Sequence, residues 1–168
     1  MHRPISLGLF LLLVASTASA APADAVLSVD AGPSYAVDGR GGATAEARGG
    51  AEVSLSDRVS LGGGIVGSLA AWADVGDQHS GDVLGVSAFA QVHVGIRLAK
   101  DVRLEPAAGF GVLHLRGDML RATLPAYGSS IAVVLGQLRL GVASRVGIGD
   151  DDGFAPDTQL TAFFGWQG

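Results

Sequence analysis

The sequence predicts an all-β protein, an eight-stranded antiparallel up-and-down transmembrane β-barrel preceded by an N-terminal signal peptide. Three observations lead to this fold class. Apolar and polar residues alternate over long stretches, which is the period of an extended chain. Mean hydropathy is high, at +0.40, although no stretch after the first twenty residues is apolar enough for a transmembrane helix. The polar half of the alternation carries charges of both signs.

The first twenty residues, MHRPISLGLFLLLVASTASA, have the three parts of a secretory signal peptide. Arg3 supplies a basic start, residues 5–15 form an apolar run, and residues 18–20 read as a small-residue cleavage site. The run is shorter than the roughly 20 residues that span a bilayer, so we favour a cleaved signal over an uncleaved anchor. We therefore expect a signal peptide at 1–20 and one barrel domain at 21–168.

Composition limits the function classes. The net charge of −5 argues against nucleic acid as a partner, because binding a phosphate backbone requires an excess of Lys and Arg. The chain has no cysteine, so it has neither disulfides nor the acylation site of a bacterial lipoprotein. Glycine, at 26 of 168 residues, is far above its usual share of ~7 %.

The clearest alternation is ATAEARGGAEVSL at 43–55, where the odd positions are apolar or Gly and the even positions carry Glu46, Arg48 and Glu52. In residues 84–98 every even position is apolar, over a length well beyond the usual 5 or 6 residues of a strand. The predicted strands cover residues 25–36, 43–55, 59–72, 83–98, 102–115, 119–126, 130–146 and 158–167.

The sixth predicted strand, 119–126, is the weakest, because it is short and contains Pro125. Without it the barrel would have seven strands, whereas bacterial single-chain barrels have an even number. The next predicted strand, 130–146, is interpreted as one continuous alternation that places Ala132, Val134 and Leu138 on the same apolar face.

Two features of the fifth predicted strand interrupt the regular pattern. Pro106 lies in mid-strand, where a closed barrel has no free edge, and it therefore predicts a bulge. The alternation also changes phase between Val112 and Leu113, as one extra residue would cause. Between the strands, tight polar turns at 56–58 and 99–101 alternate with longer acidic connections at 73–82 and 147–157.

The two faces of these strands must be assigned to the inside and the outside. A soluble sandwich or lipocalin-like barrel would bury the apolar face and expose the charges. The apolar faces are longer than a small soluble sheet needs, and they consist of Ala, Gly, Val and Leu, with few of the aromatic residues that dominate soluble cores. A membrane barrel inverts the arrangement, with apolar residues toward lipid and polar residues toward the lumen. We favour this inverted arrangement.

In the inverted arrangement, charges from neighbouring strands meet in a lumen that eight strands leave just wide enough for side chains. Opposite signs must then pair, because a lone buried charge costs several kcal/mol. The predicted lumen network consists of Glu46, Arg48, Glu52, His93, Arg97, Arg103, Glu105, Arg139 and Arg145. Aromatic residues near the strand ends form a predicted interfacial girdle of Tyr35, Trp72, Tyr127, Phe154, Phe164 and Trp166.

The last predicted strand ends with Leu160, Ala162, Phe164 and Trp166 at alternate positions. With the alternation of the whole chain, this pattern resembles the small eight-stranded outer-membrane proteins of Gram-negative bacteria, the group that contains the OmpA transmembrane domain and OmpX. The resemblance is one of pattern, and Gly168 stands where that family has a final Phe.

The resemblance implies a location in the Gram-negative outer membrane after signal cleavage, with short periplasmic turns and longer outer loops. It also implies outer-membrane lipid and lipopolysaccharide as surroundings, and the barrel-assembly machinery as a partner during biogenesis. We expect a monomer.

Three further motifs resemble known binding motifs, but each has a simpler structural interpretation. GGGIVG at 62–67 matches a dinucleotide-binding glycine pattern, but too few residues follow for the required helix, so we interpret these glycines as making interior space. Arg-Gly-Asp at 116–118 is interpreted as a turn. The acidic run is interpreted as a solvated loop, with weak cation binding as the alternative, through Asp150, Asp151, Asp152 and Asp157.

The sequence contains no cofactor motif and no defined metal site. After the signal peptide the histidines are His79, His93 and His114, and no G-x-S-x-G motif accompanies them. His79-Ser80 lacks the spacing of the outer-membrane lipid A deacylases, which hydrolyse esters with a His–Ser pair. We therefore do not expect an enzyme.

Three functions stay open at this point. The first is a structural or surface-interaction role for a barrel with a polar filled lumen. The second is a narrow porin-like pore or a channel for hydrophobic solutes. The third is a soluble periplasmic or secreted lipocalin-like binding protein.

Overall fold

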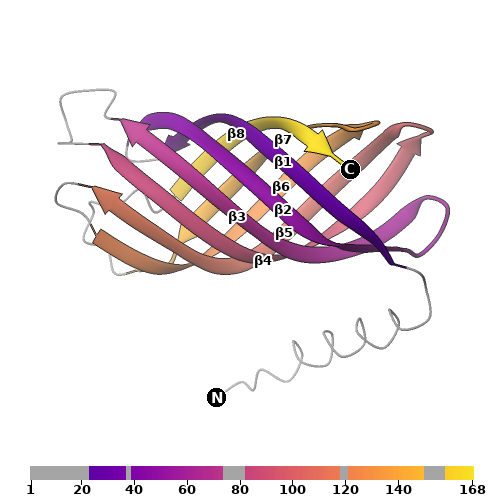
Figure 1. Ribbon diagram of the computed structural model, residues 1–168, viewed down its shortest axis with the longest axis horizontal. Helices are drawn as coiled ribbons and strands as arrows, with labels where there is room; N and C mark the ends of the chain where they lie inside the picture. Colours follow the sequence, from indigo (N-terminus) through magenta and orange to yellow (C-terminus); the bar gives the residue numbers. More distant parts are fainter. Residues whose placement is uncertain (1–22, 37–38, 74–81, 118–120, 150–157) are drawn as a thin grey trace, which may run out of the picture.

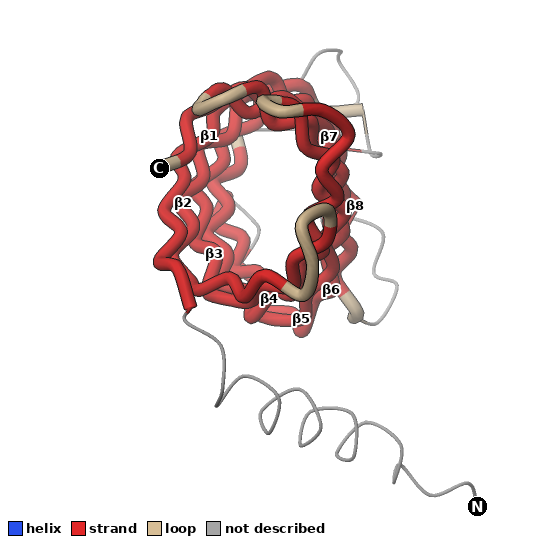
Figure 2. Tube along the Cα trace, turned by 90° about the vertical axis from the view of Figure 1, so that its right-hand side faces the viewer, coloured by secondary structure: helices blue, strands red, loops and turns tan. Residues whose placement is uncertain are grey.

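The computed structural model describes residues 23–36, 39–73, 82–117, 121–149 and 158–168. Eight antiparallel strands close into a barrel in which each strand pairs with the next and β1 pairs with β8 (Figures 1 and 2). The strands are β1 (Ala23–Ala36), β2 (Gly41–Ser54), β3 (Val59–Ala73), β4 (Val83–Ala99), β5 (Val102–Gly117), β6 (Arg121–Leu135), β7 (Leu138–Gly147) and β8 (Thr158–Gln167). Among the described residues, no helix is long and apolar enough to cross a membrane.

The barrel has a turn end and a loop end. At the turn end lie the short connections β2–β3, β4–β5 and β6–β7, together with the start of β1 and the end of β8. The strand ends that the other four connections join lie at the loop end, and each of these connections contains residues outside the described ranges. The predicted signal peptide, residues 1–20, also lies outside the described ranges. β7 and β8 have 10 residues each, against 14 to 17 in the other strands.

The structure confirms eight strands but corrects the bounds of the sixth and seventh. The sixth strand, predicted at 119–126, covers Arg121–Leu135, and the seventh, predicted at 130–146, covers Leu138–Gly147. A two-residue turn at Gly136 and Gln137 divides them, and Gly136 has a φ of 60°. Leu135 pairs with Leu138 across this turn, so the residues that face inward change from even to odd numbers. Ala132 and Val134 are therefore buried inside, whereas Leu138 is exposed outside.

The bulge expected at Pro106 and the extra residue expected near Val112 are both absent from the described pairing of β4 with β5. One register runs from Val83 opposite Gly117 to Arg97 opposite Arg103, and the irregularity lies between Arg97 and Ala99 at the turn end. Leu113 and Leu115 follow the inward phase and are buried. The change in the hydrophobic pattern marks an apolar region of the interior, not a shift of the backbone.

The barrel exposes apolar side chains and encloses polar ones, as the inverted arrangement requires. Leu27, Val29, Ile65, Val92 and Phe110 are more than half exposed on the outer wall. Most of the described ion pairs of the interior lie toward the turn end, although the Glu46–Arg145 pair lies beside Phe89 and Arg40 is buried just before β2. An apolar layer of buried side chains lies toward the loop end and consists of Ala36, Val66, Ala70, Trp72, Val83, Phe89, Leu113, Leu115 and Ala126.

Trp72 belongs to this interior apolar layer and not to the outer girdle in which it was expected. Only 1 % of the residue is exposed, and its indole Nε1–H donates a hydrogen bond to Ser34 Oγ over 3.0 Å. Its inward phase is that of Ser68 and Ala70 on the same strand. Gly85 makes room for the ring, since a Cβ at that position would lie 2.5 Å from it.

The other girdle candidates are outside or not described. Tyr35, Tyr127, Phe164 and Trp166 are each about half exposed or more on the outer wall. Phe154 lies outside the described residues.

The two-residue turn between β6 and β7 allows a direct test. The φ of 60° at Gly136 favours glycine, so Gly136→Val should lower the free energy of unfolding by roughly 1–3 kcal/mol. Gly49→Val is the matched control, because a Cβ at Gly49 meets nothing within 4 Å. Urea unfolding of the refolded barrel in lipid vesicles measures both variants. Equal midpoints for the two variants would contradict the turn.

Candidate functional site

Eight of the nine predicted lumen residues lie in the interior and take part in its ion pairs. They are Glu46, Arg48, Glu52, His93, Arg103, Glu105, Arg139 and Arg145. Arg97 is the exception and a correction, because it is exposed and makes no ion pair within the described part of the chain. It has the inward phase but lies where the β4–β5 register becomes irregular, at the mouth of the turn end.

Glu105 on β5 is the centre of the network and is completely buried. Its Oε1 accepts hydrogen bonds from Arg48 Nη1 at 2.5 Å and from Arg139 Nη2 at 3.3 Å. Its Oε2 accepts a hydrogen bond from Arg103 Nη2 at 3.0 Å. One carboxylate thus joins guanidinium groups from β2, β5 and β7, and links strands that are not neighbours in the wall.

Asp30 on β1 completes the network and was missed from the sequence. Its Oδ2 accepts a hydrogen bond from Arg139 Nη1, and both residues are buried. A signal was present, since Ser28, Asp30 and Ser34 alternate with apolar neighbours in the phase of the other lumen residues. Within this network, four carboxylates pair with four arginines.

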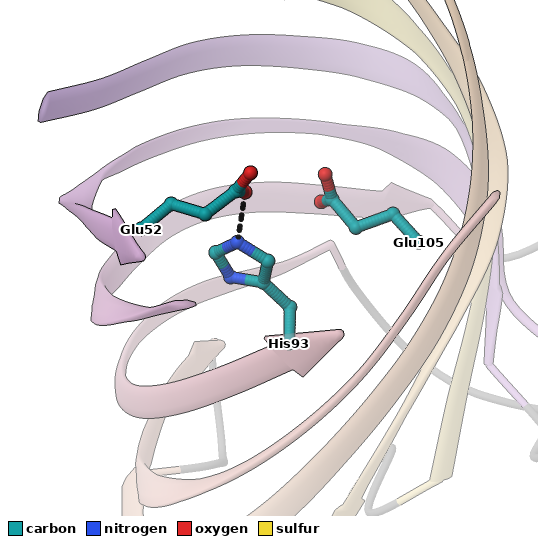
Figure 3. Close-up of side chains that lie close together, drawn as sticks. All are labelled: Glu52, His93 and Glu105. Atoms are coloured by element: carbon teal, nitrogen blue, oxygen red, sulfur yellow. Dashed lines mark hydrogen bonds and ion pairs between the residues drawn. The ribbon is translucent and has the colours of Figure 1, made fainter. Parts of the chain in front are cut away.

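A second group of contacts lies next to the centre, toward the turn end. The Nε2–H of His93 donates to Glu52 Oε2 over 2.9 Å, as the dashed line in Figure 3 marks. Arg103 Nη1 donates to the other oxygen of the same carboxylate over 2.8 Å. Gly62 makes room for the imidazole, since a Cβ there would lie 2.3 Å from the ring. This contact supports the space-making interpretation of the glycine motif at 62–67, which lies within β3.

Two interior aromatic rings support the arginines on the other side of the lumen. Arg145 donates to Glu46 Oε2, and its guanidinium lies 5.6 Å from the centre of the Phe89 ring. The guanidinium of Arg139 lies 4.7 Å from the centre of the Phe163 ring. A ring face attracts a cation, so these contacts help to hold the guanidinium groups in place inside the barrel.

Glu52, His93 and Glu105 are close enough to be considered as a metal site. One ligand atom of each lies within 4.8 Å of the others, and Figure 3 shows both carboxylates turned toward the region of the imidazole. The donors are already engaged, because Glu52 binds His93 and Arg103, and Glu105 binds three arginines. We therefore interpret the group as part of the ion-pair network.

The remaining candidates do not join this site. Asp150, Asp151, Asp152 and Asp157 lie outside the described residues, as do His79 and Asp118. His114 is on the outer wall of β5, where its Nδ1 forms a 2.8 Å hydrogen bond with Thr123 Oγ1 of β6.

Comparison with solved structures identifies the architecture. The outer membrane enzyme PagL superposes with a TM-score of 0.59 at 10 % identity, over 83 % of this chain and 97 % of that one. Neisserial surface protein A (NspA) superposes with a TM-score of 0.62 at 14 % identity, over 87 % of this chain and 97 % of that one. The fold is that of the small outer-membrane β-barrels. No family model and no curated protein sequence matches the chain.

The centre of the network predicts a large effect of one substitution. Glu105→Gln leaves Arg48, Arg103 and Arg139 without their shared carboxylate, and should lower the free energy of unfolding by about 3 kcal/mol or more. Glu46→Gln is the matched control, since it removes the same charge from a partly exposed carboxylate with one arginine partner. Urea unfolding in lipid vesicles measures both variants. A smaller loss for Glu105→Gln than for Glu46→Gln would contradict the central position of Glu105.

The engaged donors predict that divalent cations have no effect. A Zn²⁺ ion bound to Glu52, His93 and Glu105 would have to displace Arg103 and lie among guanidinium groups. Neither Zn²⁺ nor EDTA should therefore change the melting temperature of the folded barrel. A rise with Zn²⁺ that His93→Gln abolishes would establish a metal site instead.

Proposed function

We propose that this chain is a small outer-membrane β-barrel protein with a closed lumen, which acts as a structural element of the envelope or in surface contact. The observation that carries the proposal is the network that crosses the lumen from β1 and β2 to β5 and β7. The outer wall supports a lipid environment, because large apolar side chains cover it along the strands.

The proposed location is the outer membrane of a Gram-negative bacterium, after cleavage of residues 1–20. Outer-membrane lipid and lipopolysaccharide would surround a monomeric barrel, and the barrel-assembly machinery would insert it. The fold of the two similar structures supports this environment.

The spaces around the network support a closed lumen. The cavity beside Glu46, Phe89 and Arg145 has a volume of about 20 Å³, room for about one water molecule. A hollow of about 410 Å³ at the turn end extends inward as far as Glu52 and Arg103. Between these spaces the buried pairs of Glu105 occupy the interior.

The other functions would need features that these contacts do not favour. A narrow pore or a channel for hydrophobic solutes would have to break the pairs of Glu105 and Arg139 during each passage. A lipocalin-like soluble protein would have to leave the apolar outer wall in water.

We also propose that the barrel is not an enzyme, although PagL is described as one. Within the described residues, the imidazole of His93 binds the carboxylate of Glu52 and no hydroxyl group. His114 does bind the hydroxyl of Thr123, but no described carboxylate binds its imidazole as an orienting group.

Two measurements on the native chain test this proposal. Expressed with its signal in a Gram-negative host, it should occur in the outer-membrane fraction and change its mobility in SDS gels on boiling. Refolded into a planar bilayer, it should give no steady conductance, because the ion pairs fill the lumen. A soluble band that does not shift would contradict the barrel in the membrane, and a steady conductance would contradict the closed lumen alone.

A further inference from the structure

The outer wall carries one exception to its apolar character. Along the described strands, the only charged residues in the outward phase are Arg116 of β5 and Arg121 of β6. They face each other directly in the β5–β6 register, and both are exposed. Neither makes an ion pair with another described residue.

The next outward pair belongs to the same surface. His114 lies opposite Thr123, and the 2.8 Å hydrogen bond between Nδ1 and Oγ1 fixes the orientation of the imidazole. When the hydroxyl donates to Nδ1, the Nε2 atom carries the proton and is a donor. We call these four residues, His114, Arg116, Arg121 and Thr123, the outer-wall basic patch.

The patch lies just beyond the apolar band. The outward residues of β5 from Leu104 to Val112 are all uncharged, and His114 and Arg116 follow toward the loop end. At ~3.4 Å per residue and a strand tilt of about 40°, residues 104–112 rise roughly 20 Å, close to the ~25 Å apolar band of outer-membrane barrels. The two arginines thus reach the level of the lipid headgroups.

Two like charges opposite each other on a sheet repel, and the pair therefore favours an anion between them. A phosphate monoester carries about −1.5 to −2 charges and three acceptor oxygens, enough for two guanidinium groups and an imidazole N–H. The apolar wall below the patch contacts acyl chains, so a phosphate that a lipid carries gains attraction at both ends.

We propose that the outer-wall basic patch binds the phosphate headgroup of an anionic lipid in the outer leaflet. This inference rests on the proposed outer-membrane function. The bound lipid is fixed at one side of the barrel, beside β5 and β6, because the outward phase of the other described strands carries no charge.

The test compares two double variants with the same change in net charge. Arg116→Gln with Arg121→Gln removes the guanidinium groups of the patch. Arg58→Gln with Lys100→Gln removes two exposed charges from the opposite end of the barrel. Each folded barrel, verified by its mobility shift on boiling, is titrated in phosphatidylcholine bilayers with phosphatidic acid, whose headgroup is a phosphate monoester. Native mass spectrometry counts the phosphatidic acid that each barrel retains.

Affinity for phosphatidic acid should fall about fivefold for each arginine removed, and the control should equal the native chain. Equal losses in the two double variants would overturn the patch, since net charge would then explain binding. Displacement of phosphatidic acid by an equal concentration of inorganic phosphate would overturn the lipid as the source of the phosphate. Failure to shift on boiling in the native chain would instead overturn the barrel function itself.

A single variant separates binding from a structural role. Arg121→Gln relieves the repulsion of the pair, so without phosphatidic acid it should unfold at the same or a higher urea concentration than the native chain. It should still bind phosphatidic acid about fivefold more weakly. A loss of stability without any loss of binding would assign the pair a structural role and overturn the proposal.

Discussion

The lumen depends on one electrostatic requirement: the buried carboxylate of Glu105 must be matched by positive charge. Three guanidinium groups meet that carboxylate, and one of them, that of Arg139, extends the network to Asp30. Because the partners come from β1, β2, β5 and β7, the pairs connect opposite sides of the wall, which backbone hydrogen bonds alone do not do. An unpaired charge inside the barrel would cost several kcal/mol of folding free energy, and this cost favours the structure in which every charge of the network is paired.

Much of this arrangement could be predicted from the sequence, because alternation determines which side chains share a face. The eight strands, the inward charges and the space-making glycines all follow from that rule. The rule does not say where a strand stops contributing to the lumen. Alternation alone therefore assigns Arg97 to the network although it lies at the mouth. Asp30 has the lumen phase as well, and the five predicted lumen arginines with three glutamates imply one more acid.

The errors in phase have a different cause. A two-residue turn leaves the alternating pattern of the sequence unbroken, but it changes which positions face the lumen. Before the turn between Leu135 and Leu138 the even-numbered residues face inward, and after it the odd-numbered residues do. The interior is also not polar throughout. Trp72 and Leu113 are apolar like the residues of the outer wall, but they have the phase of the lumen. The space that Gly85 leaves for the indole ring becomes apparent only when neighbouring strands are paired.

Because β7 and β8 are short, the described strands do not all reach the same height at the loop end. Leu135 of β6 pairs with Leu138 of β7 at the turn end, so the five-residue difference between these two strands appears at the loop end. At ~3.4 Å per residue and a tilt of about 40°, the paired wall of β6 stands roughly 13 Å taller than that of β7. The described wall therefore differs in height around the axis of the barrel, as the wall of a cylinder of equal strands would not.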